Sequence, residues 1–511
     1  MKSGPSKQVP GQPIKKRASI IKLGNEPLKK TSSSTRFANA DVVPDENTAH
    51  KLFRSESMTR MSEQTPKNQY KIAGSLYIGQ LLVGYVLGWT APVIPKLKDI
   101  EATPFKYALS DSQASWLGSS LYFGCTSGPY LSGYLCNKIG RKPCLFIGGT
   151  ICLMGFTAMA FSKELIFMYF GRILTGVSNG MLFVTNLVYL GEMASPNIRG
   201  MLLTLTGVFT TLGTLLIYTV GPFVPYELTC WLAVLTATTY LVLVIVIVPE
   251  SPVYQVMKGY RGEAVLNLIA LGRRDDYLSI EDAASEEHKT NMEQLKEMFT
   301  YKANKRALFI IIILNISQQA SGFIAVIFFV TTIFDLTGLS LPSYIATIIV
   351  GITQVLAACL TPLFVDITGR KSLLLFSTAG CSISLATLGT YFYLHNTKDP
   401  IVSSLGWLSL SSLILFFIFF NIGFGIIPNT YVGEMFTTNV RSFGSSFTVS
   451  IGWIFGFGIA TAFGYMVPAF GAHSTFWMYS GSCAFAFFFT IFFVPETKGK
   501  TLFEIQQMLS K

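Results

Sequence analysis

The chain has 511 residues, of which 50% are hydrophobic and 13% are charged, whereas a soluble globular chain carries roughly 25% charged residues. This shortage of charge indicates a protein surrounded by lipid and excludes a soluble enzyme. The formal net charge of +11 would suit nucleic acid in a soluble protein, but in a membrane protein Lys and Arg gather in cytoplasmic segments for topological reasons, so we expect no nucleic-acid partner.

The first 70 residues, 1–70, are rich in Lys, Arg, Ser, Thr and Pro and contain few large apolar side chains. Such a segment cannot bury enough apolar surface to offset the entropy of ordering, so we predict a disordered tail. The run Lys15–Ser19 suits a basic-directed kinase, contact with anionic lipid, or simply an ordinary charged tail. No signal peptide precedes the first apolar run near Ile72, so we expect a cytoplasmic tail.

Apolar runs of about twenty residues recur from there onward, each long enough at 1.5 Å per residue to cross roughly 30 Å of hydrocarbon. The pattern predicts an all-α membrane protein with twelve transmembrane helices, six in residues 71–248 and six in residues 306–494. The segment 249–305 between them is expected to form short cytoplasmic helices, and 495–511 a cytoplasmic tail. The predicted spans are 72–91, 113–136, 143–162, 166–190, 200–220, 229–248, 306–334, 343–364, 372–394, 405–431, 441–465 and 474–494.

Basic residues fall in every second connection between these spans, at Arg141, Arg199, Arg370 and Arg441 and in the 249–305 segment. Because positive residues accumulate on the cytoplasmic side, both termini are expected there. The sequence therefore predicts a multi-pass protein of the plasma membrane.

An internal repeat relates the two sets of spans. Tyr189–Arg199 (YLGEMASPNIR) reappears as Tyr431–Arg441 (YVGEMFTTNVR), with six of eleven positions identical, and Gly140–Lys142 matches Gly369–Lys371. A duplicated six-helix unit explains both pairs. Two pseudo-symmetric halves with a site between them imply transport by alternating access.

Several short motifs stand out in the sequence, most of them at or near the ends of the predicted spans. They are Gly133–Lys142 (GYLCNKIGRK), Gly171–Arg172, Pro249–Pro252 (PESP), Gln318–Gly322 (QQASG), Asp366–Lys371 (DITGRK) and Pro495–Lys500 (PETKGK). This set resembles the sugar porter family of the major facilitator superfamily over residues 72–508. Within that family, Gly471–Trp477 (GAHSTFW) and the Ser/Thr/Lys-rich tail look most like the insect facilitated trehalose transporters.

The charged motifs of each half can meet at the cytoplasmic mouth. Each half places a Gly-Arg-Lys turn after one span and a Glu-to-Arg pair after another, so opposite charges can latch one conformation. Topological anchoring alone accounts for the arginines but not for a glutamate at the same place in both halves. In the family this network holds the outward-facing state. The expected latch residues are Arg141, Glu192, Arg199, Asp366, Arg370, Glu434 and Arg441.

Two further features concern how such a carrier would work. Gly423, Gly425 and Pro428 in the tenth span remove side chains and a backbone donor, so a bend or local unwinding is expected there. A proton-driven carrier needs a titratable group at membrane depth, and none stands out in the spans. Val86 occupies the position where proton-coupled sugar porters carry Asp, so passive transport is the better hypothesis.

The resemblance places a sugar site between the halves, where hydrogen-bonding side chains and an aromatic surface are needed. The family holds such residues at Gln318 and Gln319 in the seventh span, Gln354 in the eighth and Trp453 in the eleventh. The alternatives are hydrogen bonds between helices for the glutamines and simple packing for Trp453.

Other positions of that site depart from the hexose carriers. Gly207 stands where these have Gln, Ile324 and Gly452 where they have Asn, and Asn429 where they have Trp. Several polar contacts to a hexose are thus missing. The two glycines also enlarge the cavity, which would suit a disaccharide such as trehalose or a less polar solute.

The sequence therefore favours a facilitative sugar uniporter for trehalose or a hexose, with the lipid bilayer as its surroundings. Two alternatives remain open: a non-transporting sugar sensor or receptor, and a carrier of a different small polar solute. An enzyme is not expected, because His50, His288, His395 and His473 are scattered and form no nucleophile-base or metal-ligand pattern. We expect no cofactor and no metal, and the sequence does not give the oligomeric state.

Overall fold

The computed structural model describes residues 65–510 except 274–275, 278–279, 282–290, 338–340, 404 and 501. Most of the predicted tail, including Lys15–Ser19, lies outside the described residues. The last part of that tail is helical, because the first described helix begins at Thr65.

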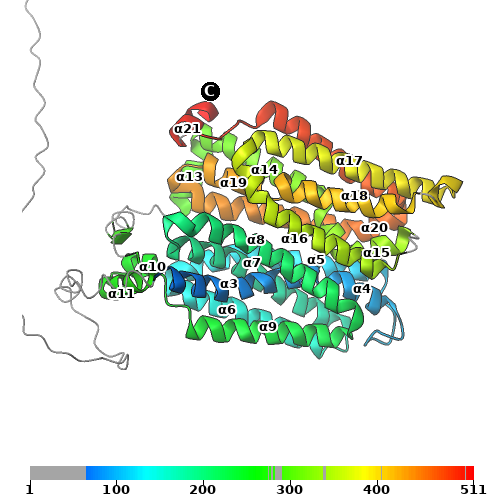
Figure 1. Cartoon of the computed structure of the whole chain (residues 1–511), viewed down its shortest axis with the longest axis horizontal. Helices are drawn as coiled ribbons and strands as arrows, with labels where there is room; N and C mark the ends of the chain where they lie inside the picture. Colours follow the sequence, from blue (N-terminus) through cyan, green and yellow to red (C-terminus); the bar gives the residue numbers. More distant parts are fainter. Residues whose placement is uncertain are drawn as a thin grey trace, which may run out of the picture. The chain divides into compact units, whose positions relative to one another are not determined.

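The first half is a set of long helices connected by short turns (Figure 1). The first span is interrupted at Trp89, where one helix ends and the next begins. The helices are α3 (Thr65–Gly88), α4 (Thr90–Lys98), α5 (Asp111–Ile139), α6 (Arg141–Ala160), α7 (Leu165–Met193), α8 (Pro196–Val220), η2 (Gly221–Phe223) and α9 (Tyr226–Val246).

The second half repeats this arrangement, and its seventh span is interrupted between Ala320 and Phe323, where Gly322 has φ of 75°. The tenth span passes through a π-helix, and Gly471, with φ of 79°, divides the last long helix into two spans. The helices are α14 (Lys302–Ala320), α15 (Phe323–Thr337), α16 (Ser343–Thr368), α17 (Arg370–Asn396), η4 (Pro400–Ser403), α18 (Gly406–Phe419), η5 (Phe420–Phe424), α19 (Ile427–Met435) and α20 (Thr438–Phe493).

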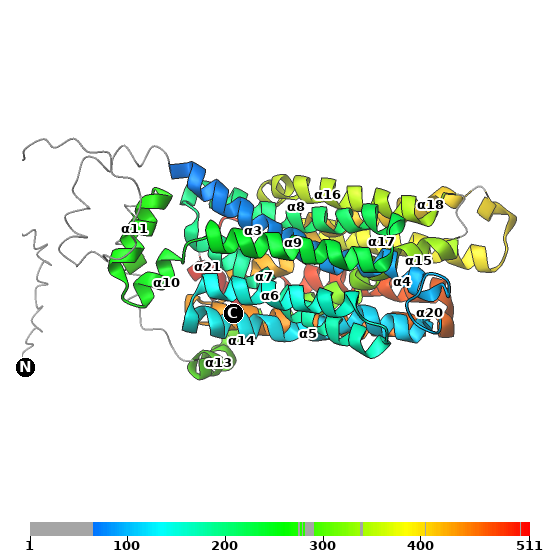
Figure 2. The same ribbon diagram turned by 90° about the horizontal axis from the view of Figure 1, so that it is seen from below.

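Four short helices lie together at one end of the bundle, the end that carries both Gly-Arg-Lys turns (Figures 1 and 2). We call it the turn end. The helices are α10 (Pro252–Met257), α11 (Arg261–Leu271), α13 (Asn291–Thr300) and α21 (Leu502–Ser510).

Ten helices in the described part of the chain are long and apolar enough to cross a membrane. The turn at Gly471 makes two spans of α20. The remaining span is α5, which has 29 residues but is rich in Ser and Gly, many of them buried where it packs against other helices of the bundle, chiefly α7 and α20. The predicted all-α fold of twelve transmembrane helices is thereby confirmed.

Close helix packing depends on glycine at several crossings. A Cβ added at Gly84 of α3 would lie 1.7 Å from the carbonyl oxygen of Thr210 in α8, and one at Gly176 would lie 2.1 Å from that of Leu121. Because no side chain fits in these gaps, the helices approach backbone to backbone, as is common in membrane bundles.

The halves contact each other through α5 against α20, α8 against α16, and α4 against α15. Several of the contacts lie away from the turn end. The Tyr218 hydroxyl donates to the Ile327 carbonyl at 3.0 Å, and Trp116 Nε1 donates to the Tyr465 hydroxyl at 3.1 Å. The halves are therefore tied together at the end opposite the Gly-Arg-Lys turns.

Candidate functional site

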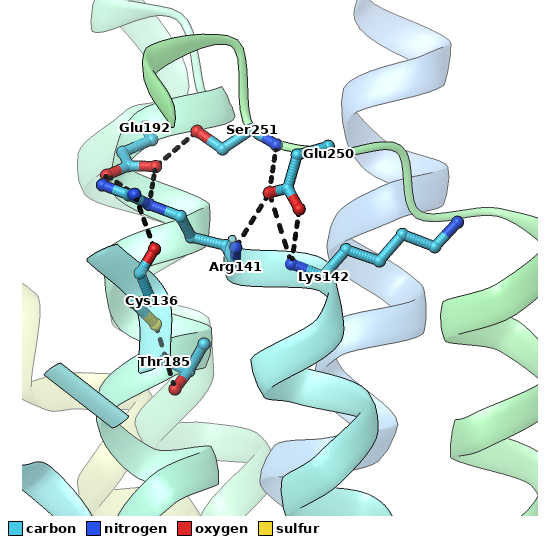
Figure 3. Close-up of polar contacts among 7 residues, drawn as sticks. All are labelled: Cys136, Arg141, Lys142, Thr185, Glu192, Glu250 and Ser251. Atoms are coloured by element: carbon cyan, nitrogen blue, oxygen red, sulfur yellow. Dashed lines mark hydrogen bonds and ion pairs between the residues drawn. The ribbon is translucent and has the colours of Figure 1, made fainter. Parts of the chain in front are cut away.

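A buried ion pair organises the turn end of the first half (Figure 3). Arg141 at the start of α6 reaches Glu192 near the end of α7, with 2.8 Å between Nη2 and Oε1 and 3.0 Å between Nε and Oε2. Its Nη1 donates to the Cys136 carbonyl at 3.1 Å, and the Ser251 hydroxyl donates to Glu192. The pair is thus bidentate and surrounded by further hydrogen bonds.

Glu250 closes the same cluster from the segment that follows α9. Its Oε1 accepts the backbone N–H groups of Arg141 at 2.9 Å and Lys142 at 3.3 Å, at the N-terminus of α6. A carboxylate is stabilised there by the free N–H groups and the helix dipole. Gly140 has φ of 109°, and a Cβ on it would lie 2.3 Å from Glu250 Oε2, so the turn requires glycine.

The second half builds the same cluster from the repeated motifs. Arg370 Nε lies 3.1 Å from Glu434 Oε1, and the Thr497 hydroxyl donates to Glu434 Oε2. Glu496 accepts the backbone N–H groups of Arg370 and Lys371, each at 3.0 Å. The sequence repeat is therefore a repeat of side-chain geometry as well.

The Glu496 carboxyl is tuned by opposing effects. Burial raises its pKa, but the backbone N–H groups of Lys498, Arg370, Lys371 and Thr497 lower it more. The pKa consequently lies below its ordinary value of 4.5, and the group is a carboxylate at neutral pH.

The two clusters differ in tightness. The Arg141 side chain is 6% exposed and uses three nitrogens, whereas that of Arg370 is 21% exposed and reaches Glu434 through Nε alone. A pocket of about 290 Å³ opens beside Arg370 and Glu434, next to α21. The second ion pair is therefore the more accessible one.

Three residues of the expected latch remain, Arg199, Asp366 and Arg441, and the structure describes an ion pair for none of them. Arg199 does not reach Glu192: its Nη2 donates to the Ala194 carbonyl at 3.3 Å, and its Nε has no partner among the described residues. The side chains of Asp366 and Arg441 lie outside the described part of the structure. Glu192 thus pairs with the Gly-Arg-Lys arginine of another helix and not with the arginine of its own motif.

Gln318 in the seventh span supports the predicted break in the tenth. Its Nε2 donates to the carbonyls of Phe424 at 2.7 Å and Gly425 at 3.0 Å, where the π-helix η5 gives way to α19. These carbonyls lie at a break in the helix, so Gln318 supplies hydrogen bonds where the regular ladder is interrupted. The local unwinding expected at Gly423, Gly425 and Pro428 is present.

The other two glutamines have free polar atoms in the bundle interior. Gln319 Oε1 and Gln354 Nε2 are buried and find no hydrogen-bond partner in the part of the chain that the structure describes. Gln319 Oε1 lies 2.9 Å from where a Cβ on Gly456 would be, beside the Tyr122 ring. Gln354 lies on α16, which packs against η5.

Trp453 lies on the same helix as Gly456 and points across the interface between the halves. Its ring makes an edge contact with Phe183 of α7, at 6.3 Å between centroids, and lies 3.0 Å from where a Cβ on Gly180 would be. Gly456 follows Trp453 by three residues on α20, so the two residues lie on one face of that helix. An added Cβ on Gly207 would meet no atom within 4 Å, which marks open space there.

Comparison with known proteins decides the family. The profile of the sugar (and other) transporter family matches residues 72–509. The chain belongs to this family. Facilitated trehalose transporters of Aedes aegypti and Culex quinquefasciatus are 32% and 31% identical to it, over 86% of this chain. The match covers 55% of the Aedes protein and 86% of the Culex protein, so the chain spans about half the length of the former.

The fold is that of solved transporters. The E. coli xylose transporter XylE in an inward-open conformation matches with a TM-score of 0.72 and 24% identity, over 86% of this chain and 99% of that one. The proton:xylose symporter XylE with a bromodeoxyglucose bound matches with a TM-score of 0.70, over 87% of this chain and 100% of that one. The major facilitator fold predicted from the sequence is thereby confirmed.

This member of the sugar transporter family also holds a buried charge that the sequence marks only as part of the Gly171–Arg172 motif. Arg172 in α7 is completely buried; its Nη1 donates to the Val86 carbonyl at 3.0 Å and its Nε to that of Leu117 at 3.4 Å. The guanidinium lies 5.3 Å from the Trp89 ring, and Nη2 has no partner among the described residues. The sequence feature that points to this residue is an arginine inside an apolar run, because a charge within a membrane span is costly and is retained for a reason.

Proposed function

We propose that the protein is a facilitative sugar uniporter that works by alternating access. The observation that carries the proposal is a pair of unpartnered amide atoms inside a transporter fold: Gln319 Oε1, which lies close to Tyr122 of the other half, and Gln354 Nε2. In the proposed topology the turn end is cytoplasmic, both termini are cytoplasmic, and the protein resides in the plasma membrane.

The proposed sugar site consists of Gln318, Gln319, Gln354 and Trp453. A buried polar atom without a partner costs about 1–3 kcal/mol, which a bound hydroxylated solute can recover. A sugar hydroxyl can donate to Gln319 Oε1 and accept from Gln354 Nε2, because each hydroxyl does both. Trp453 offers the apolar ring faces of the sugar a flat surface.

We propose a disaccharide of the trehalose type as the cargo. The relatives that match over most of this chain are named facilitated trehalose transporters. Gly207 leaves open space on α8, which we propose as room for a second ring. Ile324 stands where an amide would hydrogen-bond a hexose.

Passive transport follows from the charges. In the described spans the only buried charge we place at depth is Arg172, which binds backbone carbonyls, while the glutamates of both clusters lie at the turn end. Without a carboxylate that takes up and releases a proton on the sugar pathway, uptake cannot be driven by a proton gradient.

The clusters at the turn end act as the conformational latch. The two ion pairs, Arg141–Glu192 and Arg370–Glu434, each join residues of one half, while the halves contact each other at the opposite end. We propose that Arg141, Glu192, Arg199, Asp366, Arg370, Glu434 and Arg441 form contacts across the halves when the turn end closes. Breaking a pair then changes the rate of conformational exchange more than it changes sugar binding.

The function is tested with the purified full chain in liposomes. Radiolabelled trehalose should enter until the concentrations are equal, at a rate that a protonophore does not change, and Gln319→Ala should weaken binding about tenfold by removing one hydrogen bond. Accumulation above the outside concentration would contradict the uniporter. Sugar binding without flux would favour the sensor, and flux of another polar solute but no sugar would favour a different cargo.

The latch has a separate test in the same liposomes. Glu434→Gln should alter the transport rate severalfold with little change in affinity, and exchanging the charges of Arg370 and Glu434 should restore part of the rate. Glu281→Gln is the matched control, because Glu281 also pairs with an arginine, Arg261 at 3.0 Å, but outside both clusters. Equal effects of the two substitutions on the transport rate would contradict the latch, because Glu434 would then matter no more than an ordinary surface charge.

A further inference from the structure

Three sulfur atoms are packed together at the turn end of the first half. Cys136 near the end of α5, Cys144 in the first turns of α6 and Met181 of α7 form a small buried cluster separate from the main core. Both thiols lie at one hydroxyl, Thr185 Oγ1, at 3.9 Å for Cys136 and 3.4 Å for Cys144. The two thiols therefore share one neighbour and pack in the same small cluster.

The thiols flank the turn that carries the latch arginine. Cys136 precedes Gly140 by four residues and Cys144 follows it by four. The Cys136 carbonyl accepts from Arg141 Nη1 at 3.1 Å, while the other nitrogens of Arg141 hold Glu192 (Figure 3). A shift in the position of Cys136 therefore moves Arg141 and changes its contacts with Glu192.

The fold does not require this thiol pair. At the same offsets from Gly369 the second half has Val365 and Leu373, so the repeated turn forms with aliphatic residues there. All eight cysteines are unpaired in the structure, and Cys136 and Cys144 are the two that share one hydroxyl. The Arg141 guanidinium, which donates to the Cys136 carbonyl, places a positive charge close to the pair, and such a charge favours the thiolate form that reacts.

We propose that Cys136 and Cys144 form a dithiol that hydrogen peroxide oxidises to a disulfide, and that the disulfide slows transport. Cys136, 7% exposed against 0% for Cys144, meets the oxidant first. Its sulfur attacks the O–O bond, giving a sulfenic acid and one water; the Cys144 sulfur then displaces the hydroxyl group as a second water. Two thiols lose two electrons and two protons, and one peroxide becomes two waters.

The disulfide ties α5 to α6 across the Gly140–Arg141 turn. A short covalent loop restricts the movement of the turn, and with it the freedom of Arg141 to leave Glu192. Since the latch must rearrange in each transport cycle, the consequence for rate rests on the proposed function, whereas formation of the bond does not. A thiol reductant reverses the reaction by thiol–disulfide exchange.

The test uses the full chain in liposomes, treated with hydrogen peroxide and then with a thiol-blocking reagent. Mass spectrometry should find a peptide joining Cys136 to Cys144, and dithiothreitol should remove it. Trehalose uptake should fall about tenfold, equal to about 1.4 kcal/mol in the barrier, and recover on reduction. Cys136→Ser and Cys144→Ser should each abolish the response.

Two matched variants distinguish the effect of oxidising this thiol pair from the effect of oxidising other cysteines. Cys152→Ser removes another buried thiol of α6, and Cys359→Ser removes an exposed one; both should respond to peroxide like the unmodified chain. Absence of the joined peptide overturns the proposal whatever the variants do. A joined peptide with unchanged uptake overturns the effect on rate. A protein that forms the joined peptide but moves no sugar even before oxidation contradicts the transport function instead.

Discussion

Replacing Gln318 by Ala should destabilise the second half by a predictable amount. The Gln318 side chain is 8% exposed, and its amide nitrogen donates to two carbonyls at the break between η5 and α19, those of Phe424 at 2.7 Å and Gly425 at 3.0 Å. A buried acceptor that loses its donor costs about 1–3 kcal/mol, so the two together cost about 2 kcal/mol or more in unfolding free energy.

The measurement is thermal unfolding of the purified protein, followed by tryptophan fluorescence. Gln318→Ala should unfold several degrees below the unmodified chain, whereas Gln319→Ala, which removes an amide oxygen without a partner, should change little. If the Gln318 carbonyl oxygen also contacts sugar, as we propose, its loss weakens binding about tenfold in addition. Equal stability of Gln318→Ala and the unmodified chain would refute the role of Gln318 in supporting the break between η5 and α19. A large loss of stability in Gln319→Ala would assign that role to Gln319 instead.

Three further predictions follow from the packing and the charges. Gly84→Ala should prevent folding or halve expression, since its Cβ would lie 1.7 Å from a backbone oxygen, whereas Gly74→Ala on the same helix meets nothing within 4 Å and should be tolerated. Val86→Asp puts a carboxylate beside the buried guanidinium of Arg172, so liposome uptake should become pH-dependent; flat profiles in both proteins would contradict this. Because the pKa of Glu496 is lowered by folding, its contribution to stability is present above its ordinary pKa of 4.5 and is lost as the pH falls through the lower folded value. Glu496→Gln should therefore unfold with a weaker pH dependence in acid, measured by the same fluorescence.

The fold could be predicted from the sequence because each part of the signal is local. Apolar runs of membrane length and a repeated motif define the spans and their duplication without any knowledge of contacts. Only α5 fell below the usual apolar content, because small residues such as Gly124 and Gly128 let it pack closely against α7. The break in the tenth span was likewise predicted from Gly423, Gly425 and Pro428 alone.

The pairing of charges could not be predicted in the same way. Glu192 and Arg199 are close along the chain, but a new helix begins at Pro196, and the partner of Glu192 is an arginine brought in by α6. Nor does sequence spacing decide which of two consecutive glutamines turns toward the broken helix. They point about 100° apart, and only the packed neighbours select Gln318 for the carbonyls and leave the Gln319 oxygen unpartnered.

The unequal tightness of the two clusters has a consequence for kinetics. In a passive carrier the ratio of maximal rate to half-saturating concentration must be the same for influx and efflux, because no energy source sets a direction. That constraint leaves the two half-saturating concentrations free to differ. A bidentate pair at Arg141 and a single contact at Arg370 give the halves different resistance to rearrangement. Because both clusters lie at the turn end, they bias the proposed carrier toward one of its two conformations, and it can then saturate at different sugar levels on its two faces while still equilibrating them.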